Sequence, residues 1–230
     1  MQENYSLKMK SFDVGPMLNI IYLVWDQGTK DCIIVDPAWD LGSVFTFIKK
    51  EQLKLKKILL THSHHDHVNS IDEILNDYDI PIYLNKYELD FWNKSYDNII
   101  TTESEDEIVL GSSHFKALHT PGHTPGSCCY LFDHKLIAGD TLFVFGCGRC
   151  DLHGGNPEQM FFSLNRMKDT LSKQTIILPG HNYSIQKQST LEEEIIGNPF
   201  FSFDKLDEFV KYRMHEHDKI REEPYSPISL

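Results

Sequence analysis

The sequence has few cysteines, a deficit of cations and no long apolar run. Five cysteines in 230 residues are too few and too irregularly spaced for a disulfide framework, so we expect reduced thiols. Lys and Arg number 22 against 34 Asp and Glu, and the resulting formal net charge of −12 disfavours nucleic-acid binding. No apolar run approaches the roughly 18 residues that a membrane span needs, and residues 1–40 lack a leader pattern. These absences predict a cytoplasmic protein with neither a nucleic-acid nor a membrane partner.

The length and the hydrophobic periodicity predict one α/β domain with two sheets. Apolar runs bounded by turn residues indicate strands at 17–24, 32–35, 56–60 and 81–84, and then at 108–110, 115–118, 128–132, 135–138 and 175–178. Helical spacing indicates helices at 41–50, 68–76 and 160–171, whereas the acidic stretch 93–106 is expected to be a surface loop. Two sheets with helices on their outer sides make an αββα sandwich. We expect this core over residues 1–185 and a helical extension packed on it over 186–230.

Histidine is the residue type in excess, and seven of the twelve histidines lie at 62–67, 119–123 and 181. His62 and His64 follow an apolar run, and in an extended segment they point to the same face, where they can chelate one ion. Asp66 and His67 point elsewhere and can serve a second ion. The alternative is a histidine-rich surface loop, but four imidazoles this close would repel one another when charged. The spacing therefore favours a metal site.

Three later strand-to-loop junctions carry further ligand types. His123 lies in a Pro- and Gly-rich loop, Asp140 follows a strand, and His181 follows Pro179-Gly180. Imidazole and carboxylate ligands suit Zn²⁺ and, less selectively, Fe or Mn. Six or seven such groups are too many for one tetrahedral ion. Together they predict a binuclear centre.

The pattern His62-x-His64-x-Asp66-His67, followed by His123, Asp140 and His181, resembles the metallo-β-lactamase superfamily over nearly the whole chain. The resemblance implies an αββα metallo-β-lactamase sandwich with a short C-terminal helical segment and two Zn ions, with Fe or Mn as alternatives. By position, the implied ligands are His62, His64 and His123 for the first ion, Asp66, His67 and His181 for the second, and Asp140 as the bridge between them. Asp66 and Asp140 are the implied catalytic residues. His65 and His119 are expected to lie outside the ligand set.

Three stretches resemble glyoxalase II, the hydroxyacylglutathione thioester hydrolase: Thr120–Gly126, Ala138–Arg149 and Asn198–Phe200. By position, Arg149 falls where that family has a cationic substrate contact, and Tyr183 falls where it has a tyrosine contact. The alternatives without a substrate-binding role are a surface ion pair for Arg149 and, for Tyr183, an aromatic side chain packed at the rim of the site. Asp151 replaces an aromatic contact of that family, and the basic C-terminal motif for glutathione has no clean counterpart in residues 212–219. The glutathione pocket is therefore in doubt.

Four longer blocks, at 12–16, 36–40, 146–152 and 212–218, resemble the zinc-dependent hydrolases of trans-acyltransferase polyketide synthase clusters. That resemblance implies cleavage of acyl groups from an acyl carrier protein, with a small thioester as the other substrate class. A thiol has a pKa of about 8.5, so a thiolate leaves with little protonation, which also favours a thioester over an amide. We therefore expect a binuclear thioester hydrolase of polyketide biosynthesis. Glyoxalase II is the alternative, and a persulfide dioxygenase, which needs one redox-active iron, comes after it.

The pair Cys147-x-x-Cys150 has the spacing of a redox pair or of half a zinc site. The sequence contains no second pair of this spacing, and the family motif already accounts for Cys147. We therefore expect no redox or metal chemistry from these two cysteines.

Overall fold

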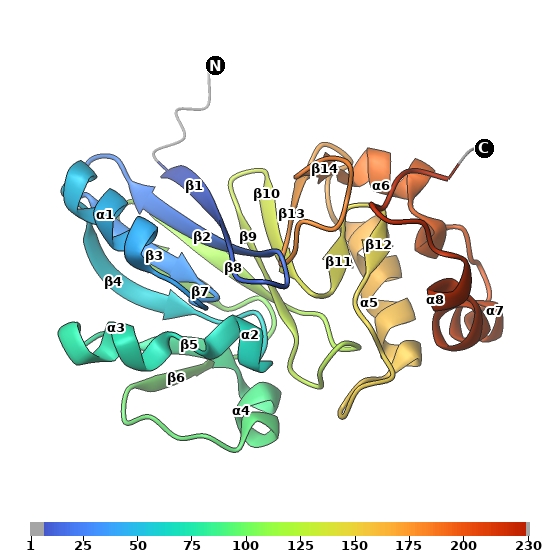
Figure 1. Cartoon of the computed structure of the whole chain (residues 1–230), viewed down its shortest axis with the longest axis horizontal. Helices are drawn as coiled ribbons and strands as arrows, with labels where there is room; N and C mark the ends of the chain where they lie inside the picture. The colour runs from blue at the N-terminus through green and yellow to red at the C-terminus, as the bar shows by residue number, and fades with distance from the viewer. Residues whose placement is uncertain (1–6, 229–230) are drawn as a thin grey trace.

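The computed structural model describes residues 7–228, which form two six-stranded sheets and a two-stranded ribbon (Figure 1). The first sheet contains, in spatial order, β1 (Leu7–Val14), β2 (Asn19–Asp26), β3 (Asp31–Val35), β4 (Lys54–Leu59), β5 (Ile82–Asn85) and β6 (Ile99–Thr102). Its first three strands are antiparallel, and the pairs from β3 to β6 are parallel. The expected loop at 93–106 thus contains β6. This short edge strand is held by backbone pairing to β5 and lacks the apolar run that would have revealed it.

The second sheet has the order β14-β13-β10-β9-β8-β7 and is antiparallel except for the parallel pair β10/β13. Its strands are β7 (Glu107–Leu110), β8 (Ser113–His119), β9 (Cys128–Phe132), β10 (Lys135–Gly139), β13 (Ile176–Pro179) and β14 (Ser189–Thr190). The ribbon pairs β11 (Leu142–Phe143) with β12 (Gly146–Cys147). The largely antiparallel second sheet agrees with the sequence.

Strand β2 shows how the layers share the core, because all but one of its residues are buried. Ile21 and Leu23 pack with Val44 of α1 (Gly42–Glu51) and Ile74 of α3 (Ile71–Asp77) on the outer face. The alternate residues Ile20, Tyr22 and Val24 pack on the inner face against side chains of the second sheet, such as Phe115 and Tyr130. Because side-chain direction alternates along the strand, β2 contributes side chains to two separate hydrophobic cores. The resulting αββα sandwich is the expected fold.

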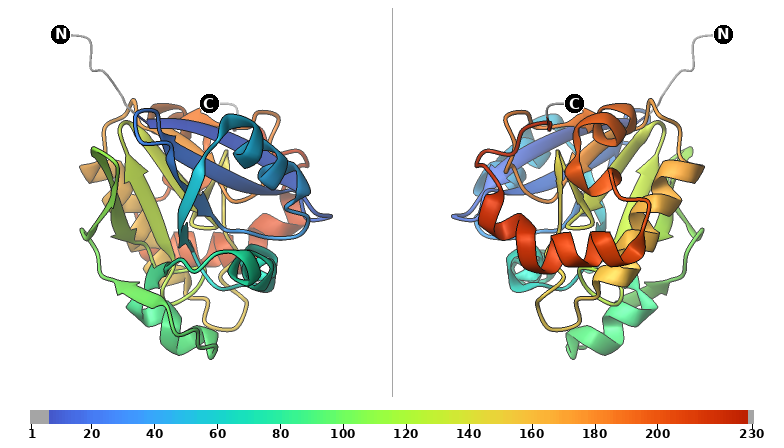
Figure 2. Two further views of the ribbon diagram at one scale, coloured as in Figure 1. Left: turned by 90° about the vertical axis from the view of Figure 1, so that its left-hand side faces the viewer. Right: turned by 90° about the vertical axis from the view of Figure 1, so that its right-hand side faces the viewer.

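The outer side of the second sheet is covered by α5 (Pro157–Thr170) and by the C-terminal segment (Figure 2). That segment comprises α6 (Leu191–Gly197), the 3-10 turn η1 (Pro199–Phe201), α7 (Leu206–Lys211), the π-helical turn η2 (Tyr212–Glu216) and α8 (His217–Ile220). Phe200 and Phe209 share a buried cluster with Phe161 of α5 and Leu136 of β10. The C-terminal segment is therefore helical and short, as expected, while the boundary at residue 185 stays a prediction. Within residues 7–228, no helix has the length and apolarity needed to cross a membrane.

Candidate metal centre

All seven side chains expected as metal ligands lie together at one end of the two sheets. His62 and His64 come from the loop after β4, and Asp66 and His67 from the short helix α2 (His65–Val68). The other three follow strands of the second sheet: His123 in the β8–β9 loop, Asp140 after β10 and His181 after β13. The local reason is that parallel strands β4 and β5, and β10 and β13, end at the same edge of their sheets, where their loops meet.

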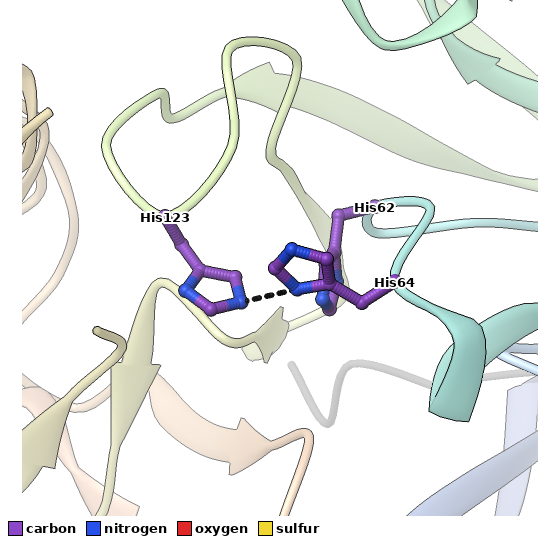
Figure 3. Close-up of side chains that lie close together, drawn as sticks. All are labelled: His62, His64 and His123. Atoms are coloured by element: carbon purple, nitrogen blue, oxygen red, sulfur yellow. Dashed lines mark hydrogen bonds between the residues drawn. The ribbon is translucent and has the colours of Figure 1, made fainter. Parts of the chain in front are cut away.

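His62, His64 and His123 form one group, with one ligand atom from each within 4.8 Å of the others. His64 Nδ1 and His123 Nε2 are 2.8 Å apart, and the His62 ring centre lies 4.8 Å from each of the other two. Figure 3 shows the three rings converging, with His123 reaching across from its own loop. Three imidazole nitrogens facing one point make a three-sided pocket for an ion.

Asp66, His67 and His181 form a second group under the same criterion. The Nε2 atoms of His67 and His181 are 3.2 Å apart, and Asp66 Oδ2 lies 3.5 and 3.4 Å from them, respectively. Asp140 stands between the two groups. Its Oδ1 lies 3.4 Å from His67 Nε2, and its Oδ2 lies 3.4 Å from both His123 Nε2 and His181 Nε2. One carboxylate thus faces both groups.

The outward ring nitrogens are held by fixed partners. His123 Nδ1 donates to the Arg149 carbonyl oxygen at 2.7 Å, and His181 Nδ1 donates to the Met17 carbonyl oxygen at 2.8 Å. His67 Nδ1 lies 3.0 Å from Asp36 Oδ2. Such partners set the tautomer and orient each ring, so that Nε2 points to the centre.

The chemistry of these groups fits divalent cations. His62 Nε2 and Asp140 Oδ1 are buried and have no hydrogen-bond partner among residues 7–228. Burial lowers the pKa of His62 well below its ordinary value, which keeps the imidazole neutral. Burial opposes ionisation of Asp140, but His181 and His67 outweigh it and hold the pKa of this carboxyl well below its ordinary value. At His62 and Asp140, the neutral imidazole and the ionised carboxylate are the forms that bind metals.

A buried glutamate that the sequence did not single out joins the two ligand loops. Glu88, on α4 (Lys86–Trp92), is fully buried. Its Oε1 accepts hydrogen bonds from the Ser63 backbone N–H and Oγ at 2.7 and 2.6 Å. Its Oε2 accepts from Thr124 Oγ1 and the Gly126 backbone N–H at 2.7 and 3.0 Å. A Cβ on Gly126 would lie 2.1 Å from the Glu88 backbone nitrogen, so only glycine permits this approach.

Asp36 is a second buried carboxylate, and the sequence patterns did not indicate a role for it. Its oxygens accept from the Thr61 backbone N–H at 2.7 Å and from Thr61 Oγ1 at 2.6 Å, and it also contacts His67. Asn19 adds a third support, because its Nδ2 donates to Asp66 Oδ2 at 2.8 Å. Neither residue lies near the histidine motif in sequence, so no local signal could have revealed them.

The cluster forms the floor of a cavity of about 530 Å³. Both expected substrate contacts line it: Tyr183 stacks on His181 with ring centres 4.7 Å apart, and Arg149 stands at the rim. Arg213 and Arg221, which the sequence indicated as cations at the mouth, also line the cavity, together with Tyr225, which the sequence did not single out. His65 also lines the cavity but belongs to neither group, and His119 bonds the Pro125 carbonyl oxygen instead.

Cys147 and Cys150 are buried free thiols. Burial raises the pKa of Cys147 to about 12 and raises the pKa of Cys150 as well. Both are therefore protonated at neutral pH, which is the inert form of cysteine.

Comparisons with known proteins agree with this geometry. A family model described as the metallo-beta-lactamase superfamily matches residues 15–181. The probable polyketide biosynthesis zinc-dependent hydrolase PksB of Bacillus subtilis is 34% identical over 201 residues, covering 87% of this chain and 89% of that protein. A hydroxyacylglutathione hydrolase of Actinobacillus pleuropneumoniae is 32% identical over 237 residues, covering 88% and 96%, respectively.

Among solved structures, ETHE1 from Myxococcus xanthus superposes with a TM-score of 0.82 at 26% identity, covering 90% of each chain. A family model that spans most of the chain and relatives above 30% identity point to the same fold and, through the zinc-dependent relatives, to a metal centre. The chain belongs to the metallo-beta-lactamase superfamily.

Proposed function

We propose that this protein is a binuclear metal-dependent hydrolase that cleaves acyl groups from the phosphopantetheine arm of an acyl carrier protein. The observation that carries the proposal is the position of Asp140, whose carboxylate lies 3.4 Å from ligand nitrogens of both groups at the floor of a cavity. In this proposal His62, His64 and His123 would hold one ion, Asp66, His67 and His181 would hold the other, and Asp140 would be shared between them.

Two divalent ions held there would supply Lewis acidity, which polarises an acyl carbonyl and lowers the pKa of water to near neutrality. The residues of the chain do the rest. Asp140, ionised and buried, keeps the two groups at a fixed separation. Tyr183, stacked on His181, would form an aromatic wall of the substrate cavity. Cleavage of a thioester releases a thiolate, which needs no dedicated acid, and this favours a thioester substrate.

The carrier is proposed from the relatives and from the cavity wall. The similarity to the probable polyketide biosynthesis hydrolase covers most of both chains. A pantetheine arm carries one phosphate on a long neutral chain, so a few cations at the mouth are enough to bind it. Arg213 and Arg221, on the C-terminal segment, line the cavity and are the cations proposed for this contact.

The second candidate is a hydroxyacylglutathione hydrolase, favoured by the relative at 32% identity and by Arg149 and Tyr183 in the cavity wall. Metal analysis of the purified protein separates the reaction classes. Two ions per chain support the hydrolase, one iron supports an oxygenase, and none supports a non-catalytic scaffold.

A parallel turnover assay then identifies the carrier, with lactoylglutathione, an acyl-pantetheine and an acyl carrier protein thioester as substrates. We expect the highest kcat/KM with the carrier protein thioester. A tenfold preference for lactoylglutathione, which corresponds to about 1.4 kcal/mol in transition-state binding, would replace this proposal by the glutathione hydrolase.

A further inference from the structure

The three arginines that line the cavity are each engaged by a carboxylate of the chain. Arg213 donates to Asp218 at 2.7 Å, and Arg221 lies 2.9 Å from Glu223. Arg149 differs from both in its geometry. Its Nε donates to one oxygen of Asp151 at 2.9 Å, and its Nη2 donates to the other oxygen at 2.6 Å.

This bidentate pair occupies one of the two edges of the Arg149 guanidinium at which two parallel N–H groups match the two oxygens of a carboxylate. Asp151 is only two residues away on the same loop, so it competes with any bound ligand from a high local concentration. Arg149 lines the cavity, and the side chains of Arg149 and Asp151 are 53% and 40% exposed, so the pair is accessible to a ligand at the rim. A ligand carboxylate must displace Asp151 to reach this edge, whereas a neutral chain need not.

We propose that Asp151 is a specificity-determining residue that disfavours thiol carriers bearing free carboxylates, such as glutathione, and so favours carriers with a neutral arm. This inference rests on the proposed thioester hydrolysis for its biological meaning. Asp151 lies outside both ligand groups and touches Arg149 alone through its side chain in the described hydrogen bonds. Its effect therefore belongs to the binding of the leaving thiol and not to the acyl-transfer step.

The test uses Asp151→Asn, which keeps the size of the side chain but removes its charge, in the full metal-loaded protein. The expected result is a KM for lactoylglutathione lower by about three- to fivefold with an unchanged kcat, since exposed ion pairs are weak. The kcat/KM for a neutral acyl-pantetheine should change less than twofold. High salt should shrink the gain, because exposed charges are screened. The double variant Arg149→Gln with Asp151→Asn should not show the decrease in KM for lactoylglutathione.

Asp13→Asn is the matched control, because Asp13 forms an exposed ion pair with Lys187 and does not line the cavity. It removes the same charge, so it should leave both KM values unchanged. An equal shift for both substrates in Asp151→Asn, or the same shift in the control, would overturn the inference. So would an unchanged KM for lactoylglutathione.

A binding measurement separates this inference from the proposed function. S-hexylglutathione, a thioether that cannot be hydrolysed, is titrated calorimetrically into the unmodified protein and into Asp151→Asn. Tighter binding by the variant supports the role of Asp151 even if no thioester is turned over, in which case the proposed function alone fails. Equal binding by the two proteins overturns the role of Asp151 even if the carrier protein thioester is hydrolysed.

Discussion

The floor and the rim of the cavity are built on different principles. At the floor, the rings of His67, His123 and His181 are buried, and each is oriented by a second hydrogen bond. At the rim, Arg149 and Arg221 are partly exposed and are paired with carboxylates close by on the same segment. A buried network permits one arrangement, because every lost partner leaves an unsatisfied group. An exposed ion pair exchanges partners at little cost. The geometry of the ligand groups is thus fixed at the floor, whereas the ion pairs at the rim can change partners.

The largest effect is expected from Asp140→Ala, a change at the floor. Asp140 faces both ligand groups, so its loss should release metal and abolish hydrolysis together. Metal content by elemental analysis and turnover of a thioester are the measurements. A variant that kept two ions per chain and normal turnover would show that the centre does not depend on a shared carboxylate.

The next largest effect is expected from Glu88→Gln, which tests whether the floor includes residues that never face the centre. The amide can no longer accept all four hydrogen bonds that tie the two loops. Metal affinity, measured by competition with a chelator, should fall about 10- to 100-fold, as for other partners that orient ligands. Glu103→Gln makes the same change at an exposed ion pair with Lys86 and should leave the affinity unchanged. Equal metal affinities in the unmodified protein and both variants would show that Glu88 does not support the metal ligands.

Glu194 tests the support of the rim. This buried carboxyl accepts from the Phe145 backbone N–H at 3.0 Å and so holds the loop between β11 and β12. Burial raises the pKa of Glu194 from 4.5 to about 7. The folded state therefore binds a proton more tightly than the unfolded state, and stability should decline as the pH rises from 4.5 to 7.

Glu194→Gln should flatten that decline, which is worth up to about 3 kcal/mol by linkage. Denaturant unfolding at several pH values is the measurement. A variant whose stability falls over this window as steeply as that of the unmodified protein would assign the pH dependence to other groups.

The smallest effect on the centre is expected from Cys147→Ser combined with Cys150→Ser. Both thiols are buried and protonated, and neither belongs to a ligand group. Stability should fall by about 1 to 3 kcal/mol, because a buried hydroxyl costs more than a thiol unless it finds a partner. Metal content should not change. Loss of an ion in this variant would show that Cys147 and Cys150 contribute to metal binding.

Sequence patterns predicted the floor better than the rim. His62 to His67 lie within six residues, and His123, Asp140 and His181 each follow a recognisable strand, so local patterns indicated these residues and the family resemblance implied their roles. Glu88 was missed because its partners lie 25 to 38 residues away, a distance over which no periodicity acts. The same limit hid β6, an edge strand that depends on its neighbour β5.

The rim depends on side-chain conformation, which spacing does not determine. Arg149 and Asp151 are two residues apart, and in a regular strand they would share a face without necessarily closing a bidentate pair. Arg213 was placed at the mouth of the cavity, yet it is 3% exposed and lies in a π-helical turn. The π-helical turn was not visible in the sequence, because such turns have no apolar period of their own.

Met17 contributes to the site through both its main chain and its side chain. Its carbonyl oxygen orients His181, and its side chain, 46% exposed, forms part of the cavity entrance. Every amino acid has the carbonyl oxygen, so replacement of the side chain reshapes the entrance without withdrawing the acceptor. A point mutation at this position can therefore change the shape of the entrance while the acceptor for His181 stays in place. A deletion in the same turn would move the carbonyl oxygen itself, so the site depends more on the length of this turn than on the side chain of Met17.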